Sequence, residues 1–118
     1  MEALNMLFGA FLFKSMLISS RKEAVKLLNE GHLVQMQAFG SSMEPLLYSG
    51  SVLTFQACEQ YTIDDIVFCK VDGNFIDAHK IIEIDPDKGY LIANNKGKIN
   101  GWTHWVYGKV VGVDVPEK

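Results

Sequence analysis

The chain has 118 residues, of which 48% are hydrophobic and 21% are charged, and its formal net charge is −3. This length and composition predict one domain whose core is large enough to fold without disulfides. The mild acidity disfavours a nucleic-acid-binding surface, which normally carries a stripe of lysine and arginine. The two cysteines, Cys58 and Cys69, lack the spacing of a zinc site, and free thiols fit a reducing compartment. We therefore expect a cytoplasmic protein that holds neither metal nor cofactor.

An apolar segment opens the chain, and we assign residues 1–18 to an N-terminal helix ahead of a domain over residues 19–118. Ala3 to Phe13 are almost all apolar, but this run is about half of the ~20 residues that a membrane-spanning helix needs. Three alternatives follow. The segment packs against the domain or against a second copy in a homodimer, residues 3–18 contact a membrane surface, or the segment is an upstream extension with Met16 as a later start.

The rest of the chain changes from a helical to a strand-like pattern. A helix is predicted after Ser20, because Ser20 and Glu23 have the spacing of a capping box. Short alternating runs then predict strands over 33–39, 51–57, 65–71, 74–84, 89–93 and 105–115. Asp72-Gly73 between two of them is a hairpin signal. Adjacent short strands with no helix between them predict a mainly β, antiparallel domain with one or two N-terminal helices.

The candidate nucleophile is Ser42, in the segment Gly-Ser-Ser-Met-Glu-Pro that begins at Gly40. A strand-like run leads straight into this segment, and Gly40 and Pro45 bracket the serine pair. Such a tight turn presents a side chain and leaves backbone N–H groups free to stabilise an oxyanion, here those of Ser41 or Ser42. A serine hydroxyl still needs a neighbouring base to accept its proton.

Two candidate bases, His79 and Lys80, follow one another in a later strand-like run. Consecutive residues of a strand point to opposite faces, so only one of them can reach Ser42. A histidine titrates near neutral pH without help, whereas a lysine needs burial before it can act as a base. The alternation puts Asp77 on the face of His79 and puts Lys80 on the face that looks buried. The pattern alone leaves both bases open.

Several stretches of the chain recur together in one known group of enzymes. The nucleophile segment Gly40 to Leu47 is followed by Asp64 to Phe68 (Asp-Asp-Ile-Val-Phe), by His79 to Ile84 (His-Lys-Ile-Ile-Glu-Ile), by Asn94 to Thr103 and by Tyr107 to Val113. In this order, over about residues 33–115, they resemble the S24/S26 serine peptidases, which include signal peptidases and the self-cleaving SOS and phage repressors. The stretch from Asn94 is similar to a variant of the family's Gly-Asp-Asn-Asn box in small phage-related S24-like proteins.

This resemblance implies a serine endopeptidase fold in which Ser42 is the nucleophile and His79 is the general base. The His-Lys stretch is similar to the His-Arg-Val-Ile box of archaeal and endoplasmic-reticulum signal peptidases, in which histidine replaces the bacterial lysine. The implied partner is a peptide or protein substrate, bound as an added strand at an open sheet edge.

The chain also departs from the family pattern. Ala93, Asn94 and Asn95 stand where the family has its acid, so we name Asp77 and Asp114 as candidate substitutes. A histidine base without an acid partner is poorly oriented. The chain also lacks the Ala-Gly or Cys-Gly bond that repressors of this family cut in themselves. The alternative function is therefore a catalytically impaired, peptidase-like binding or regulatory module of phage or mobile-element origin.

Overall fold

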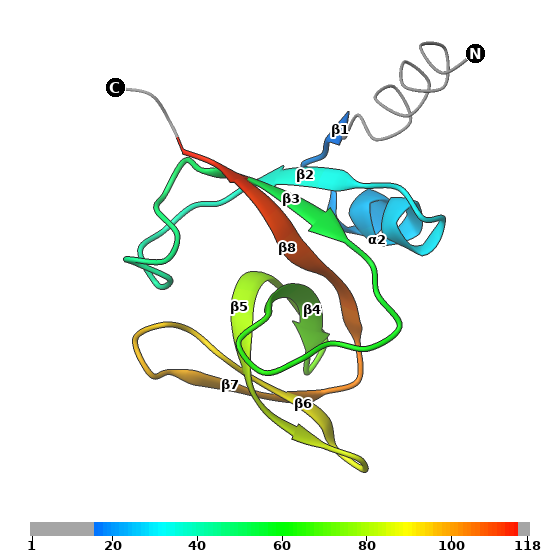
Figure 1. The fold of residues 1–118 in the computed structure, drawn as a ribbon, viewed down its shortest axis with the longest axis vertical. Coiled ribbons are helices and arrows are strands. Elements are labelled where there is room, and N and C mark those ends of the chain that lie inside the picture. The colour runs from blue at the N-terminus through cyan, green and yellow to red at the C-terminus, as the bar shows by residue number, and fades with distance from the viewer. Residues whose placement is uncertain (1–15, 116–118) are drawn as a thin grey trace, which may run out of the picture.

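The computed structural model describes residues 16–115, whose fold is a curled sheet with one short helix at its side (Figure 1). The elements are β1 (Met16–Leu17), α2 (Arg21–Asn29), β2 (Val34–Gln37), β3 (Val52–Gln56), β4 (Ile66–Val71), β5 (Asn74–Asp85), β6 (Gly89–Ala93), β7 (Ile99–Thr103) and β8 (Val106–Asp114). The strand order across the sheet is β1-β2-β3-β8-β4-β5-β6-β7. Strands β2 to β8 pair antiparallel, and β1 joins β2 in parallel.

This architecture confirms the predicted mainly β, antiparallel domain with one N-terminal helix. Each of the six predicted strands is present within a few residues of its expected bounds. Two strands were not predicted, β1 and β7. The predicted helix over 1–18 lies outside the described residues except for its end, where Met16 and Leu17 form a strand instead. Within the described residues, no helix is long and apolar enough to cross a membrane.

Helix α2 forms where the capping box predicts it and covers one face of the sheet. The Ser20 side chain accepts a hydrogen bond from the Glu23 N–H at 3.3 Å, which satisfies one of the free donors of the first turn. Three apolar residues of the helix are buried against β2, β3 and the centre of the sheet: Ala24, Leu27 and Leu28. The helix therefore holds β2 in place, and β2 is the strand that leads to the candidate nucleophile.

Strand β4 is the centre of the fold because both of its faces are buried. Phe68 lies in the core under α2, and its ring contacts those of Phe55, Phe75 and Tyr107. Val67 and Cys69 point the other way, into a second core against Tyr61, Val71, Ile81 and Ile92. Alternate residues of a strand face opposite sides, so a strand with two buried faces reads as a continuous apolar run, as Ile-Val-Phe-Cys does here.

Bulges in several strand pairs curl the sheet. On β5, both Asp77 and Ala78 stand opposite Phe68, so the pairing with β4 shifts by one residue. On β7, Asn100 is an extra residue between the pairs Ile92–Gly101 and Ala93–Ile99. A bulge interrupts the alternation of side chains and increases the local twist. The simple alternation along β5 predicted from the sequence is therefore wrong across Asp77 and Ala78.

The position of Phe68 predicts a large loss of stability on truncation. We expect Phe68→Ala to lower the free energy of unfolding by about 3–5 kcal/mol, because it opens a cavity among three aromatic rings. Urea denaturation measures the change. The matched control is Phe39→Ala, where the ring is 73% exposed, and its expected cost is below about 0.5 kcal/mol. Equal costs at the two positions would contradict the assigned core.

The two cysteines differ in a way that thiol labelling can detect. Burial raises the pKa of the Cys69 thiol to about 12, so almost no reactive thiolate exists there at pH 8. Cys58 is only partly buried. We expect iodoacetamide at pH 8 to modify Cys58 alone in the folded protein and both cysteines in denaturant. Modification of Cys69 at the same rate as Cys58 in the folded state would contradict this placement.

Candidate active site

The turn that carries Ser42 is held in place by its neighbours in sequence. Gly40 has a φ of 92°, a conformation that side-chain-bearing residues rarely adopt, and it turns the chain sharply after β2. Met43 and Leu47 are both 5% exposed and anchor the turn in the core under α2. Ser42, directly before Met43, is half-buried. The sequence Gly-Ser-Ser-Met therefore positions a serine hydroxyl at the edge of the core.

The Ser42 hydroxyl meets the imidazole of His79, which lies 37 residues later on β5. The distance from Ser42 Oγ to His79 Nε2 is 3.3 Å. The other ring nitrogen, Nδ1, lies 2.7 Å from Oδ1 of Asn100 on β7. The structure thus brings the two predicted site residues together and adds a third, Asn100, that the sequence analysis did not identify.

This arrangement defines a protonation pattern for the neutral histidine. With the amide oxygen of Asn100 facing it, Nδ1 must carry the ring proton for this contact to be a hydrogen bond. Nε2 is then left with a lone pair directed at the Ser42 hydroxyl. A serine, a histidine that accepts from it and a third group that orients the histidine form the arrangement of a nucleophilic triad. The same side-chain order with asparagine as third member occurs in papain-like cysteine proteases.

Asn100 reaches the histidine because of the β7 bulge. As the extra residue of β7, it leaves the regular alternation of that strand. Bulges of this kind often redirect a side chain next to a functional site. In the sequence, the only signals of β7 are a turn at Asn94 to Gly97 and a short run with glycine at its centre, from Ile99 to Thr103. Neither signal reveals which strand of the sheet β7 approaches.

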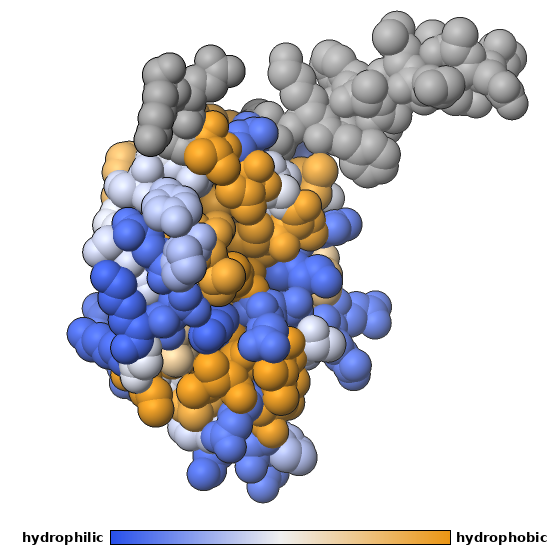
Figure 2. All heavy atoms as spheres, turned by 60° about the vertical axis from the view of Figure 1, so that its left-hand side comes forward, coloured by the Kyte–Doolittle hydropathy of each residue, from blue (hydrophilic) through white to orange (hydrophobic). Residues whose placement is uncertain are grey.

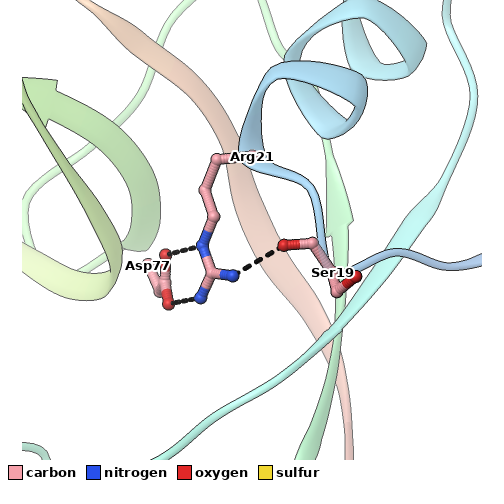
Figure 3. A network of polar contacts seen from close by, with 3 residues as sticks. All are labelled: Ser19, Arg21 and Asp77. Atoms are coloured by element: carbon pink, nitrogen blue, oxygen red, sulfur yellow. Dashed lines mark hydrogen bonds and ion pairs between the residues drawn. The ribbon is translucent and has the colours of Figure 1, made fainter.

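The candidate acids suggested by the sequence do not contact His79. Asp77 instead forms an ion pair with Arg21 of α2, in which Nε lies 2.9 Å from Oδ1 and a terminal nitrogen binds Oδ2 (Figure 3). Arg21 also donates to the Ser19 carbonyl at 2.7 Å. The hydrogen bond to Asp77 raises the pKa of the Arg21 guanidinium. Asp114 lies at the end of β8, where it pairs with Val52. The bulge at Asp77 explains the error, because the prediction assumed unbroken alternation.

Lys80, the other candidate base, contacts the side chain of Asn95 instead of the Ser42 hydroxyl. Its Nζ donates to Asn95 Oδ1 at 3.1 Å. Lys96 lies nearby, with Nζ 3.4 Å from Ser41 Oγ. His104 is exposed, and its Nε2 contacts the Asp87 carbonyl at 2.8 Å. The geometry therefore favours His79 as the partner of Ser42.

Backbone donors are available beside the nucleophile. Within residues 16–115, the N–H groups of Ser41 and Ser42 donate to no acceptor, whereas the neighbouring Gly40 N–H donates to Ser49 Oγ at 3.1 Å. The Ser42 carbonyl accepts from the Asn95 N–H at 3.0 Å, which fixes the peptide on the other side of the residue. Free N–H groups in a fixed turn are the donors that an oxyanion needs.

Two adjoining pockets open beside the serine. The first, of about 230 Å³, is lined by Ser42 and His79 together with the residues that follow β2 and the first half of β5. The second, of about 310 Å³, is lined mainly by apolar side chains, including Leu17, Ile18 and Met36. Phe39 contributes to both pockets and is 73% exposed. The two pockets, which share Phe39, are together called the groove, and its first pocket reaches Ser42.

The surface near the groove is partly apolar. Figure 2 shows two apolar patches on one face of the molecule, separated by a polar band. Three of the large apolar side chains that remain exposed line these pockets: Leu17, Phe39 and Tyr48. Exposed apolar side chains next to a groove supply contact surface for a peptide.

Compared with known proteins, the chain matches no protein-family model and no curated protein. The geometry of the site therefore carries the functional proposal.

The His79–Asn100 contact predicts a specific tautomer. We expect long-range ¹H–¹⁵N NMR spectra to show the neutral His79 ring protonated at Nδ1, because Asn100 Oδ1 accepts that proton. In Asn100→Ala, the preference for Nδ1 should weaken. A ring protonated at Nε2 in the unmodified protein would mean that the amide donates to the histidine, and would contradict the assigned base.

Proposed function

We propose that this protein is a serine endopeptidase of the S24/S26 type, with Ser42 as nucleophile, His79 as general base and Asn100 as the group that orients the base. The observation that carries the proposal is the continuous hydrogen-bonded line from Ser42 Oγ through the imidazole to Asn100 Oδ1, with contacts of 3.3 and 2.7 Å. The resemblance of the nucleophile and histidine segments to that family supports it.

The reaction follows from these positions. His79 Nε2 accepts the Ser42 hydroxyl proton while Oγ attacks the scissile carbonyl of the peptide. The N–H groups of Ser41 and Ser42 hold the resulting oxyanion. The imidazolium then gives its proton to the leaving amine as the peptide C–N bond breaks, and an acyl-enzyme remains on Ser42. Water attacks this ester with His79 again as base, which releases the second product and restores the serine.

An extended peptide fits the open edge of β2. The Ala38 N–H donates to Ser51 at 2.8 Å, and its carbonyl accepts from Gly50 at 2.7 Å, so both groups face β3. In an extended chain the neighbouring residue Gln37 directs its N–H and carbonyl to the opposite side. Among residues 16–115, β1 covers that side as far as Gln35, whose carbonyl accepts from the Ile18 N–H at 2.8 Å. A substrate strand added beyond this point would run through both pockets toward Ser42.

The third member of the triad sets the expected rate. Replacing the aspartate of a serine protease triad by asparagine costs about 10⁴ in kcat, because the amide then selects the wrong histidine tautomer. Here the amide oxygen faces Nδ1, so the tautomer is the productive one. A neutral amide still stabilises the imidazolium less than a carboxylate would. We therefore propose a slow enzyme.

The second candidate function is a binding module, and the neutral Asn100 is the observation that favours it. In that case the groove holds a peptide or protein partner without cutting it, and the protein acts as a regulatory partner of phage or mobile-element origin. For either function we propose a cytoplasmic location, because Cys58 and Cys69 are free thiols. Contact of residues 3–18 with a membrane surface and formation of a homodimer are compatible with both functions.

Cleavage assays on variants test the proposal. We expect the wild type to cut members of signal-peptide-like and random peptide pools, as seen by mass spectrometry of the products. Ser42→Ala and His79→Ala should each lower kcat by at least ~10³, because each removes a reacting group.

The matched control is His104→Ala, which removes an exposed histidine and should leave kcat within about twofold. Cleavage that survives in Ser42→Ala would contradict the mechanism. Peptide capture by Ser42→Ala and wild type with equal affinity and no cleavage by either would establish the binding module instead.

A further inference from the structure

The residue next to the proposed base makes an unexplained set of contacts. Lys80 Nζ donates to Asn95 Oδ1 at 3.1 Å, and Asn95 lies in the turn between β6 and β7. Asn95 in turn contacts the nucleophile turn twice. Its side-chain Nδ2 donates to the Glu44 carbonyl at 2.9 Å, and its backbone N–H donates to the Ser42 carbonyl at 3.0 Å.

The chemistry of the three partners fixes the orientation of the Asn95 amide. A lysine ammonium only donates hydrogen bonds, so it requires the amide oxygen. The Glu44 carbonyl only accepts, so it requires the amide nitrogen. In the observed orientation the amide oxygen and the amide nitrogen each have a hydrogen-bond partner. With the amide turned over, the nitrogen would face the ammonium and the oxygen would face the carbonyl, so neither could form a hydrogen bond. Loss of the ammonium removes the partner that holds the oxygen in place and leaves the side-chain amide with the Glu44 carbonyl alone.

The strand register makes this contact possible. Lys80 pairs with Ala93 across β5 and β6, which brings its side chain beside the turn that begins two residues later. His79, one residue earlier, approaches the Ser42 hydroxyl. Consecutive residues of β5 thus act on the two ends of the same serine: one binds its hydroxyl, and the other holds its backbone through Asn95.

We propose that Lys80 and Asn95 are positioning residues that fix the nucleophile turn, and that Lys80 is not the base. The Lys80 side chain holds the oxygen of the Asn95 side-chain amide. The side-chain amide of Asn95 holds the Glu44 carbonyl, and the backbone N–H of Asn95 holds the Ser42 carbonyl. Together these contacts keep the Ser42 hydroxyl within reach of His79 and the adjacent N–H groups aligned for the oxyanion. The expected effects on kcat rest on the proposed peptidase function. The claim that Lys80 and Asn95 hold the nucleophile turn does not depend on it.

The first test needs no catalysis. Amide hydrogen exchange followed by NMR reports how often the Asn95 N–H leaves the Ser42 carbonyl. We expect Lys80→Met, which keeps the length of the side chain and removes its donor, to speed exchange at Asn95 by roughly tenfold. Lys98→Met is the matched control, because Lys98 is an exposed lysine of the same hairpin whose backbone N–H makes its contact with Asn94. Exchange at Asn95 that is unchanged in Lys80→Met would overturn the proposal.

The second test separates positioning from base catalysis. We expect Lys80→Met to lower kcat by roughly tenfold with KM within about threefold, because a misplaced nucleophile still binds peptide. Lys80→Arg should recover much of the loss, since arginine donates hydrogen bonds but cannot be deprotonated. Adding Lys80→Met to Asn95→Ala should cost little more than Asn95→Ala alone, because both act through one chain of contacts.

The outcomes also separate the two proposals. If Lys80→Met falls to the background of Ser42→Ala and Lys80→Arg does the same, Lys80 is the base and the inference is wrong. If the wild type cuts no peptide, the peptidase proposal fails, and the exchange experiment alone decides whether Lys80 and Asn95 hold the turn.

Discussion

The candidate site depends on one imidazole that joins three parts of the chain. His79 on β5 contacts Ser42, which follows β2, and Asn100, which lies on β7. In the sheet, β2 and β7 stand near opposite ends of the strand order, so a flat sheet would keep them far apart. The sheet curls (Figure 1), and the turn after β2 lines the first pocket together with residues of β5. The bulges that produce this curl are thus a condition of the site as well as of the fold.

Packing on both sides of β4 makes this curl rigid. Phe68 and the residues of α2 fill one side, and Val67, Cys69 and Ile81 fill the other. Met43 and Leu47 extend the first core into the nucleophile turn, and the Arg21–Asp77 ion pair joins α2 to β5 beside the groove. The ion pair is about one third exposed, so its main effect is to fix geometry rather than to add stability. The serine is therefore held by core packing on one side and by Asn95 on the other.

The sequence predicts much of this account because its strongest signals are local. The capping box at Ser20, the two-residue turn at Asp72-Gly73 and the positions of the six predicted strands each depend on neighbouring residues, and each appears where expected. The pairing of Ser42 with His79 was predicted from a resemblance of segments, and the structure brings the two side chains together.

What the sequence does not predict depends on contacts between distant strands. Asn100 contacts His79 only because β7 returns beside β6 with an extra residue, and no local pattern encodes that register. Asp77 was assigned to the face of His79 by an alternation that the bulge opposite Phe68 breaks. The sequence also left open whether His79 or Lys80 is the base. The structure favours His79 because Lys80 binds the Asn95 side chain instead of the Ser42 hydroxyl.

The most direct test of the central claim is detection of the covalent intermediate. Wild-type protein would be mixed with an activated peptide ester, quenched in acid at short times and weighed intact. The account predicts a rapid gain equal to the acyl group of the ester, located on Ser42 by peptide mapping, and absent in His79→Ala. Ester or peptide cleavage without an adduct, or an adduct on any other residue, would contradict Ser42 as the nucleophile that His79 activates.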